Sequence, residues 1–228
     1  MDARLASETD LAGFREEARA LLAHQIPPDD VRWQTAFAQN ADFFSDANAP
    51  GDRGLGLPKA ASAIVPASFL RLCEVVVLHH DPDRFALLYR LLWRLVYEPS
   101  LRNDPIDNDM QHAHQMGQAV RRDIHKMKTF VKFREVDAGA PEPLQMTFYE
   151  PVHHITQAVA PWFAKRMPGT HWVIFTPDCC VESDGQKFHF TRGLPRSEAP
   201  SEDAPAHVWV AAYRRVFGER AIAPLPPG

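Results

Sequence analysis

The residues of this sequence that are best suited to chemistry lie in the run AVRRDIHKMKTFVKFRE, at positions 119–135. The run holds six lysines and arginines against two acids, whereas the whole 228-residue chain has a formal net charge of -4. A local excess of cations on an acidic protein is suited to binding phosphate groups at one limited site. The candidate nucleic-acid-binding residues are Arg121, Arg122, His125, Lys128, Lys132 and Arg134.

Helical spacing sorts this run into stripes. The basic stripe holds Arg121, His125, Lys128 and Lys132, at i, i+4, i+7 and i+11. Beside it runs an apolar stripe of Val120, Ile124, Met127 and Val131. A helix that docks through the apolar stripe would present the basic stripe at the edge of the core. The alternative is a solvated cationic face that pairs with Asp123 and with acids of the N-terminal segment, and the spacing leaves both interpretations open.

Catalysis is a second possibility for some of these residues. A lysine held near other cations can have a lowered pKa and act as a Schiff-base nucleophile, as DNA lyases require, although most lysines do not. Glu150 lies close to His153 and His154, between an expected strand and an expected helix, where the three could transfer protons or bind a metal. Helix capping by Glu150 and surface imidazoles explain the same spacing more simply. The candidate catalytic residues are His125, Lys126, Lys128, Glu150 and His153.

Cysteines and aromatic residues indicate no further site. The three cysteines form no CxxC pair, so the sequence predicts neither a disulfide framework nor a cofactor or metal, and Cys179 and Cys180 are expected to be packed thiols. An aromatic set could stack nucleic-acid bases, but alternating aromatics on strands are more typical of a core. Its members are Trp162, Phe163, Trp172, Phe175, Phe188 and Phe190. No apolar run approaches the ~20 residues of a membrane span, and we expect a cytoplasmic protein without a membrane partner.

Periodicity predicts an α+β fold. Helical spacing is found in the stretches 11–25, 67–80, 83–98, 109–129, 152–167 and 206–217, and strand patterns in 130–136, 144–150, 171–178 and 187–193. Pro161 is expected to kink or divide its helix, and the stretch 179–185 to form the last hairpin turn. The order is therefore helices followed by β-β-α-β-β-α. This predicts an antiparallel sheet in the C-terminal half, with a helical N-terminal half packed on it.

Several of these stretches resemble a known family. VRRDIHKMKTFVKFREV, FYEPVHHI, APWFAKRM and HWVIFTPD, with VPASFLRLCEVVVLHHDPDRFALLYRLLWRL before them, are similar to an uncharacterised domain of bacterial DNA-repair gene neighbourhoods. The resemblance covers roughly residues 65–220. That domain occurs beside radical-SAM proteins assigned to DNA repair, and fused to the N-terminus of X-type proteins of the uracil-DNA glycosylase superfamily. No catalytic residue is implied by it.

The resemblance and the basic run together define an expected function and domain plan. We expect an acidic helical segment over 1–60, the family-like α+β domain over 61–220, and a proline-rich linker over 221–228 that leads to a further domain. The expected function is an accessory domain for DNA damage repair that binds DNA and positions a fused or separate uracil-DNA glycosylase domain. A radical-SAM repair protein is a further expected partner. The alternatives are an enzyme that acts on a damaged base or an abasic site, and a protein-interaction module for a repair partner.

Overall fold

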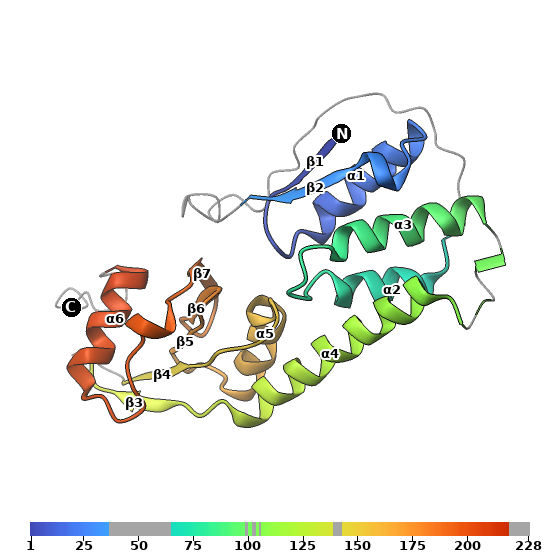
Figure 1. Cartoon of the computed structure of the whole chain (residues 1–228). Coiled ribbons are helices and arrows are strands. Elements are labelled where there is room, and N and C mark those ends of the chain that lie inside the picture. The colour runs from blue at the N-terminus through green and yellow to red at the C-terminus, as the bar shows by residue number, and fades with distance from the viewer. Residues whose placement is uncertain (37–64, 99, 102–103, 105, 139–142, 219–228) are drawn as a thin grey trace. The chain divides into compact units, whose positions relative to one another are not determined.

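The computed structural model describes residues 1–36, 65–98, 100–101, 104, 106–138 and 143–218 (Figure 1). The chain divides into two compact units, the first of which ends at Arg122 while the main part of the second begins at Asp123. Each unit is considered separately below. The domain boundary expected at residue 60 and the expected linker over 221–228 both fall outside the described residues.

The first unit begins with a small β-α-β arrangement. Strand β1 (Asp2–Leu5) pairs in parallel with β2 (Arg32–Thr35), and helix α1 (Leu11–Ala23) forms the connection between them. Asp10 caps α1, because its Oδ1 accepts a hydrogen bond of 2.8 Å from the N–H of Gly13. The sequence predicted the helix but neither strand, since four-residue strands carry little alternating pattern. The N-terminal segment is therefore not purely helical.

Helices α2 (Ala67–Val76) and α3 (Arg84–Tyr97) complete the core of this unit. Arg84 is the most unusual core residue, since its side chain is only 1% exposed. Its guanidinium donates to the carbonyl oxygens of Val77, Asp81 and Glu8 and forms an ion pair of 2.7 Å with the Glu8 carboxylate. A buried charge is tolerated only when it is paired and fully hydrogen-bonded, and these four contacts meet that condition.

Helix α4 (Asn108–Phe130) continues from the first unit into the second as one element (Figure 1). Asp107 caps it, because its Oδ1 accepts a hydrogen bond from the N–H of Met110. Arg94 binds the carboxylates of Asp107 and Asp109, which fixes the first turn in the first unit. Although α4 is long, none of the helices in the described parts of the chain is long and apolar enough to cross a membrane.

The second unit is built on a five-stranded sheet in the order β3-β4-β5-β6-β7. The strands are β3 (Arg134–Val136), β4 (Leu144–Phe148), β5 (Trp172–Phe175), β6 (Cys179–Ser183) and β7 (Phe188–Arg192). Helix α5 (Thr156–Arg166) connects β4 to β5, and α6 (Ala206–Phe217) follows β7 and ends at Gly218, whose φ is 75°. The predicted α+β class, with the sheet in the C-terminal half, is confirmed.

Two details of the predicted sheet are wrong. The order of the C-terminal half is β-β-α-β-β-β-α, because residues 179–183 form strand β6 and the turn is made by the four residues that follow, 184–187. The sheet is also mixed, because β4 and β5 are parallel, as a helical crossover requires. Pro161 lies inside α5 without dividing it.

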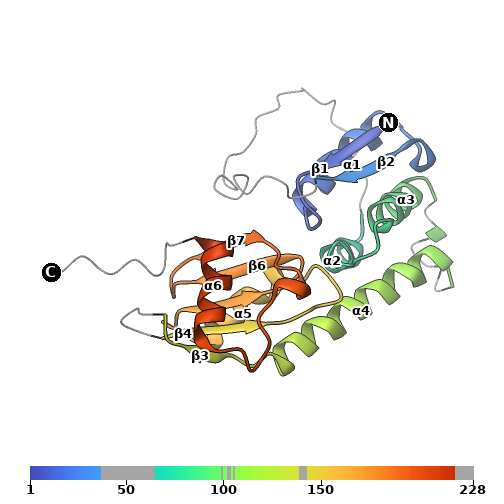
Figure 2. The same ribbon diagram turned by 60° about the vertical axis from the view of Figure 1, so that its left-hand side comes forward.

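The two helices of the second unit cover opposite faces of the sheet (Figure 2). Side chains alternate along a strand, so Trp172 and Phe175 of β5 point to different faces. Trp172 packs against Phe163 of α5, with ring centroids 6.1 Å apart, and Phe175 packs against Trp209 of α6 at 6.2 Å. This sandwich forms the core of the unit.

A buried polar network fixes α6 to the sheet. Glu182 of β6 is 5% exposed, and its Oε1 accepts from the hydroxyl of Tyr213 at 2.7 Å. The same oxygen lies 2.7 Å from Nε2 of His171. A buried carboxylate needs such donors, because burial without them is costly. The hydrogen bond between Tyr213 and Glu182 therefore joins α6 to β6 in addition to the apolar packing between them.

This network predicts the effect of removing one donor. Tyr213→Phe leaves the buried Glu182 carboxylate short of a hydrogen bond and should lower the free energy of unfolding by about 1–3 kcal/mol. Urea unfolding followed by circular dichroism measures it. Tyr97→Phe, at a side chain that is 47% exposed, is the matched control and should change little. Equal effects of the two variants would contradict the role given to Tyr213.

Candidate nucleic-acid interface

The basic run occupies the C-terminal half of α4 and continues beyond its end. Val120 and Met127 are completely buried, whereas Arg121, His125 and Lys126 are exposed. Burial thus separates the two predicted stripes at Val120 and Met127 on one side and Arg121 and His125 on the other, whereas Ile124 and Lys128 are half-buried and Val131 and Lys132 lie beyond the helix. Lys132, just beyond the helix, is also exposed.

The cations on this helix form no ion pair with an acid in the part of the chain that the structure describes. Within the described residues, no carboxylate pairs with the charged groups of Arg121, Arg122, Lys126, Lys128 or Lys132. Arginines elsewhere are used differently: Arg84, Arg90 and Arg94 each bind an acid. The alternative of a cationic face paired with Asp123 is not supported, because that carboxylate bonds to peptide N–H groups instead.

Two of the predicted phosphate ligands also have structural contacts. The ammonium group of Lys128 lies over the ring of Trp162 on α5, 5.6 Å from its centroid. Arg134 donates from Nη1 to the carbonyl oxygens of Glu202 and Ala204, both at 2.7 Å. Arg134 therefore holds β3 to the segment before α6, a role that its sequence position did not indicate.

Asp123, in the middle of the basic run, anchors the loop between β4 and α5. It is 5% exposed, and its Oδ2 accepts from the N–H groups of Val152 and His153 at 2.8 and 2.9 Å. Burial, and then the negative charge of Asp123, raise the pKa of the Tyr149 phenol above its usual value. Two stretches that the sequence marked as distinctive, RRDIHKMK and YEPVHHI, are thus joined by one carboxylate.

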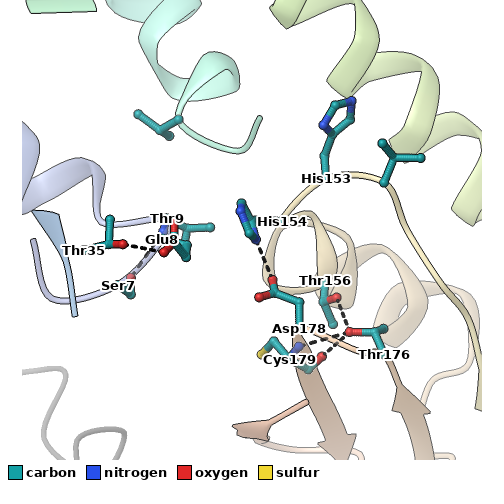
Figure 3. Close-up of polar contacts among 12 residues, drawn as sticks. Ser7, Glu8, Thr9, Thr35, His153, His154, Thr156, Thr176, Asp178 and Cys179 are labelled. Atoms are coloured by element: carbon teal, nitrogen blue, oxygen red, sulfur yellow. Dashed lines mark hydrogen bonds and ion pairs between the residues drawn. The ribbon is translucent and has the colours of Figure 1, made fainter. Parts of the chain in front are cut away.

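A histidine–aspartate pair lies where the parallel strands end. Phe148 and Phe175, the last residues of β4 and β5, are register partners, so the two following loops leave the same edge of the sheet. From these loops, Nδ1 of His154 lies 2.8 Å from Oδ2 of Asp178 (Figure 3). We call this pair the His154–Asp178 dyad. A carboxylate at Nδ1 orients the imidazole and makes Nε2 its basic nitrogen, an arrangement suited to proton transfer.

The loop that carries Asp178 is held from several sides. The hydroxyl of Thr176 accepts from the N–H of Cys179, donates to the carbonyl oxygen of Cys179, and lies 3.2 Å from the hydroxyl of Thr156 (Figure 3). Gly193 approaches the same loop so closely that an added Cβ would lie 1.9 Å from the carbonyl oxygen of Pro177. Only glycine fits there. The dyad therefore lies on a preorganised turn.

The residues predicted to be catalytic include neither member of the dyad, and they form no comparable arrangement among themselves. Glu150 is exposed, and His153 is 6% exposed with its N–H bonded to Asp123. A shallow groove of this unit, beside α6, is lined by other residues, among them Asp137, His207 and Arg214. The sequence interpretation missed Asp178, although its position directly after a buried strand was a usable signal.

Cys179, Cys180 and half of the aromatic set are buried in the core or packed against it. Burial raises the pKa of the Cys179 and Cys180 thiols to about 12, so both remain protonated at neutral pH. Phe163, Trp172 and Phe175 are core residues, at most 3% exposed. Packed thiols and a core role for these rings are what the sequence favoured.

The anchor at Asp123 can be tested by hydrogen exchange. Asp123→Ala removes the acceptor of two amide hydrogens, so the amides of Val152 and His153 should exchange at least tenfold faster, and stability should fall by about 1–3 kcal/mol. Hydrogen exchange followed by NMR measures the exchange rates of these two amides, and the slowest-exchanging amides of the unit report its stability. Asp203→Ala, at an exposed position, serves as control. Unchanged exchange at the two amides would disprove the anchor.

Comparison with known proteins gives one family. Residues 82–222 match DUF4130, a domain of unknown function. No curated protein and no solved structure matches the chain. The match begins in front of α3 and includes α4, the whole five-stranded sheet and α6. The chain belongs to the DUF4130 family.

Proposed function

We propose that this protein is a nucleic-acid-binding accessory domain of DNA damage repair, which contacts DNA phosphates through α4 and positions a fused or separate uracil-DNA glycosylase domain. The observation that carries the binding proposal is the group of cations on α4 that have no acidic partner among the described residues. The repair context, with a radical-SAM protein as a further partner, rests on the sequence resemblance described above.

The low net charge of the chain favours a DNA contact that is limited to α4. The chain as a whole is acidic, with a formal net charge of -4, so long-range attraction to DNA is weak. Binding must then come from the α4 cations, each of which releases counterions when it neutralises a phosphate. The basic stripe of Arg121, His125 and Lys128 lies along one side of one helix, where it can follow a phosphate backbone.

A salt titration tests this proposal. Arg121→Ala combined with Lys128→Ala should weaken DNA binding and reduce the slope of log K against log salt by about 2, because two phosphate contacts are lost. Fluorescence anisotropy with a labelled oligonucleotide at several salt concentrations measures both quantities. The control is Lys165→Ala combined with Arg166→Ala, which removes the same charge from exposed positions of α5.

Equal affinities and equal slopes for the wild type and the α4 variant would refute the DNA contact. Tight binding of a glycosylase domain without affinity for DNA at physiological salt would support the protein-interaction alternative instead. In that case the basic stripe docks on an acidic surface of the partner.

A second candidate function is catalysis at an abasic site, favoured by the His154–Asp178 dyad. Nε2 of His154 would take the C2′ proton of the ring-opened sugar, the C3′–O bond would break, and the phosphate would leave with the bonding electrons. A C2′=C3′ double bond would form in the sugar, and Asp178 would orient the imidazole through Nδ1. No lysine forms a Schiff base in this route, so borohydride would trap no adduct on Lys126 or Lys128.

Strand cleavage of an abasic oligonucleotide tests the second candidate. His154→Ala should lower the cleavage rate by about 10²-fold or more, which is the contribution of a general base. His207→Ala, an exposed histidine on α6, should leave the rate unchanged. Cleavage that is equal in both variants, or undetectable in the wild type, would rule out catalysis by the dyad.

A further inference from the structure

Phe130, the last residue of α4, is 65% exposed. Other phenylalanines of the second unit, such as Phe163 and Phe175, are buried in its core. Exposure of one apolar side chain is common. The position of this ring relative to the unpaired cations is what makes it informative.

Phe130 lies on the same side of α4 as Lys126 and as Asp123, the residue that anchors the loop between β4 and α5. Asp123, Lys126 and Phe130 stand at i, i+3 and i+7 of α4, which places them on one side of the helix. Val152, whose N–H binds Asp123, is 63% exposed. With a rise of about 1.5 Å per residue, Phe130 lies about 10 Å beyond Asp123 along the helix, and Lys126 lies between them.

Few large apolar side chains are exposed in the described part of this unit. In the described part of the second unit, the large hydrophobic side chains that are exposed are Phe130, Val152 and Val208. Phe130 is one of these three and stands one turn beyond Lys126 on α4, and we call Lys126 and Phe130 the Phe130 patch. The patch lies on a different side of α4 from the basic stripe. Around the helix, Arg122 and Lys126 lie beyond one edge of the buried face, and Lys128 lies beyond the other edge.

We infer that the Phe130 patch binds an unpaired base, so that the nucleic acid recognised by this domain is single-stranded or locally unpaired DNA. The ring of Phe130 stacks on the base, and the ammonium group of Lys126 contacts the adjacent phosphate. This inference rests on the proposed DNA contact and specifies its substrate.

The chemistry of the patch distinguishes between forms of DNA. In a duplex the faces of the bases are stacked on one another, and the outer surface offers phosphates that an apolar ring cannot contact favourably. In a single strand every base exposes a face on which an aromatic side chain can stack, and a neighbouring cation neutralises the backbone. A ring next to a lysine is therefore suited to the unpaired form.

The test compares one oligonucleotide in single-stranded form and in a hairpin duplex. Phe130→Ala should weaken single-strand binding roughly tenfold and leave duplex binding unchanged, because stacking is lost while the phosphate contacts remain. Phe130→Trp should restore or strengthen single-strand binding. Val208→Ala, at an exposed apolar residue of α6, is the matched control. Fluorescence anisotropy gives the affinities, and circular dichroism checks that each variant is folded.

The outcomes separate this inference from the proposed function. If Phe130→Ala changes neither affinity while the Arg121 and Lys128 double variant loses DNA binding, the base-stacking inference is wrong and the DNA contact stands. Equal losses on both forms, or a wild-type preference for the duplex, also overturn the inference. If the wild type binds neither form, the inference and the proposed function fail together.

Discussion

The candidate interface depends on one buried carboxylate. Asp123 accepts hydrogen bonds from two consecutive peptide N–H groups of the loop between β4 and α5. The loop leads from β4 into α5, the helix that connects the parallel strands β4 and β5, and Asp123 holds this loop to α4. Among the described residues, no lysine or arginine of α4 forms an ion pair with Asp123. The anchor therefore both positions His153 and His154 and leaves the basic residues available to an external anion.

The arginines show how differently one residue type is used along this chain. In the first unit Arg84, Arg90 and Arg94 hold the core and the first turn of α4 through carboxylates and carbonyl oxygens. Arg134 in the second unit has the same kind of structural role. Arg121 and Arg122, on the same helix that Arg94 helps to fix, have no acidic partner among the described residues. Charge that does not stabilise the fold is where binding is expected.

Much of the fold could be predicted from the sequence, and the misses have physical causes. The stripes on α4 follow from helical periodicity alone, so their burial was predictable at Val120 and Met127. The sequence predicted a turn over residues 179–185, whereas residues 179–183 form a strand. The turn signal of Asp184 and Gly185 was extended too far toward the N-terminus. The parallel pairing of β4 and β5 has no local signature, since it depends on contacts between residues far apart in the chain. The same holds for the site: the cations could be found by spacing, whereas the His154–Asp178 dyad and the anchor at Asp123 arise only when the strands pair.

The central claim is that α4 and the loop anchored by Asp123 form the nucleic-acid surface of this domain. Acetylation of lysines, quantified by mass spectrometry with and without a saturating single-stranded oligonucleotide, tests it most directly because all sites are measured in one unmodified protein. Lys126, Lys128 and Lys132 should lose reactivity when the oligonucleotide binds, while Lys165 on α5 and Lys187 before β7 keep theirs. Protection of Lys165 and Lys187 without protection of the three lysines at the end of α4 would contradict the account.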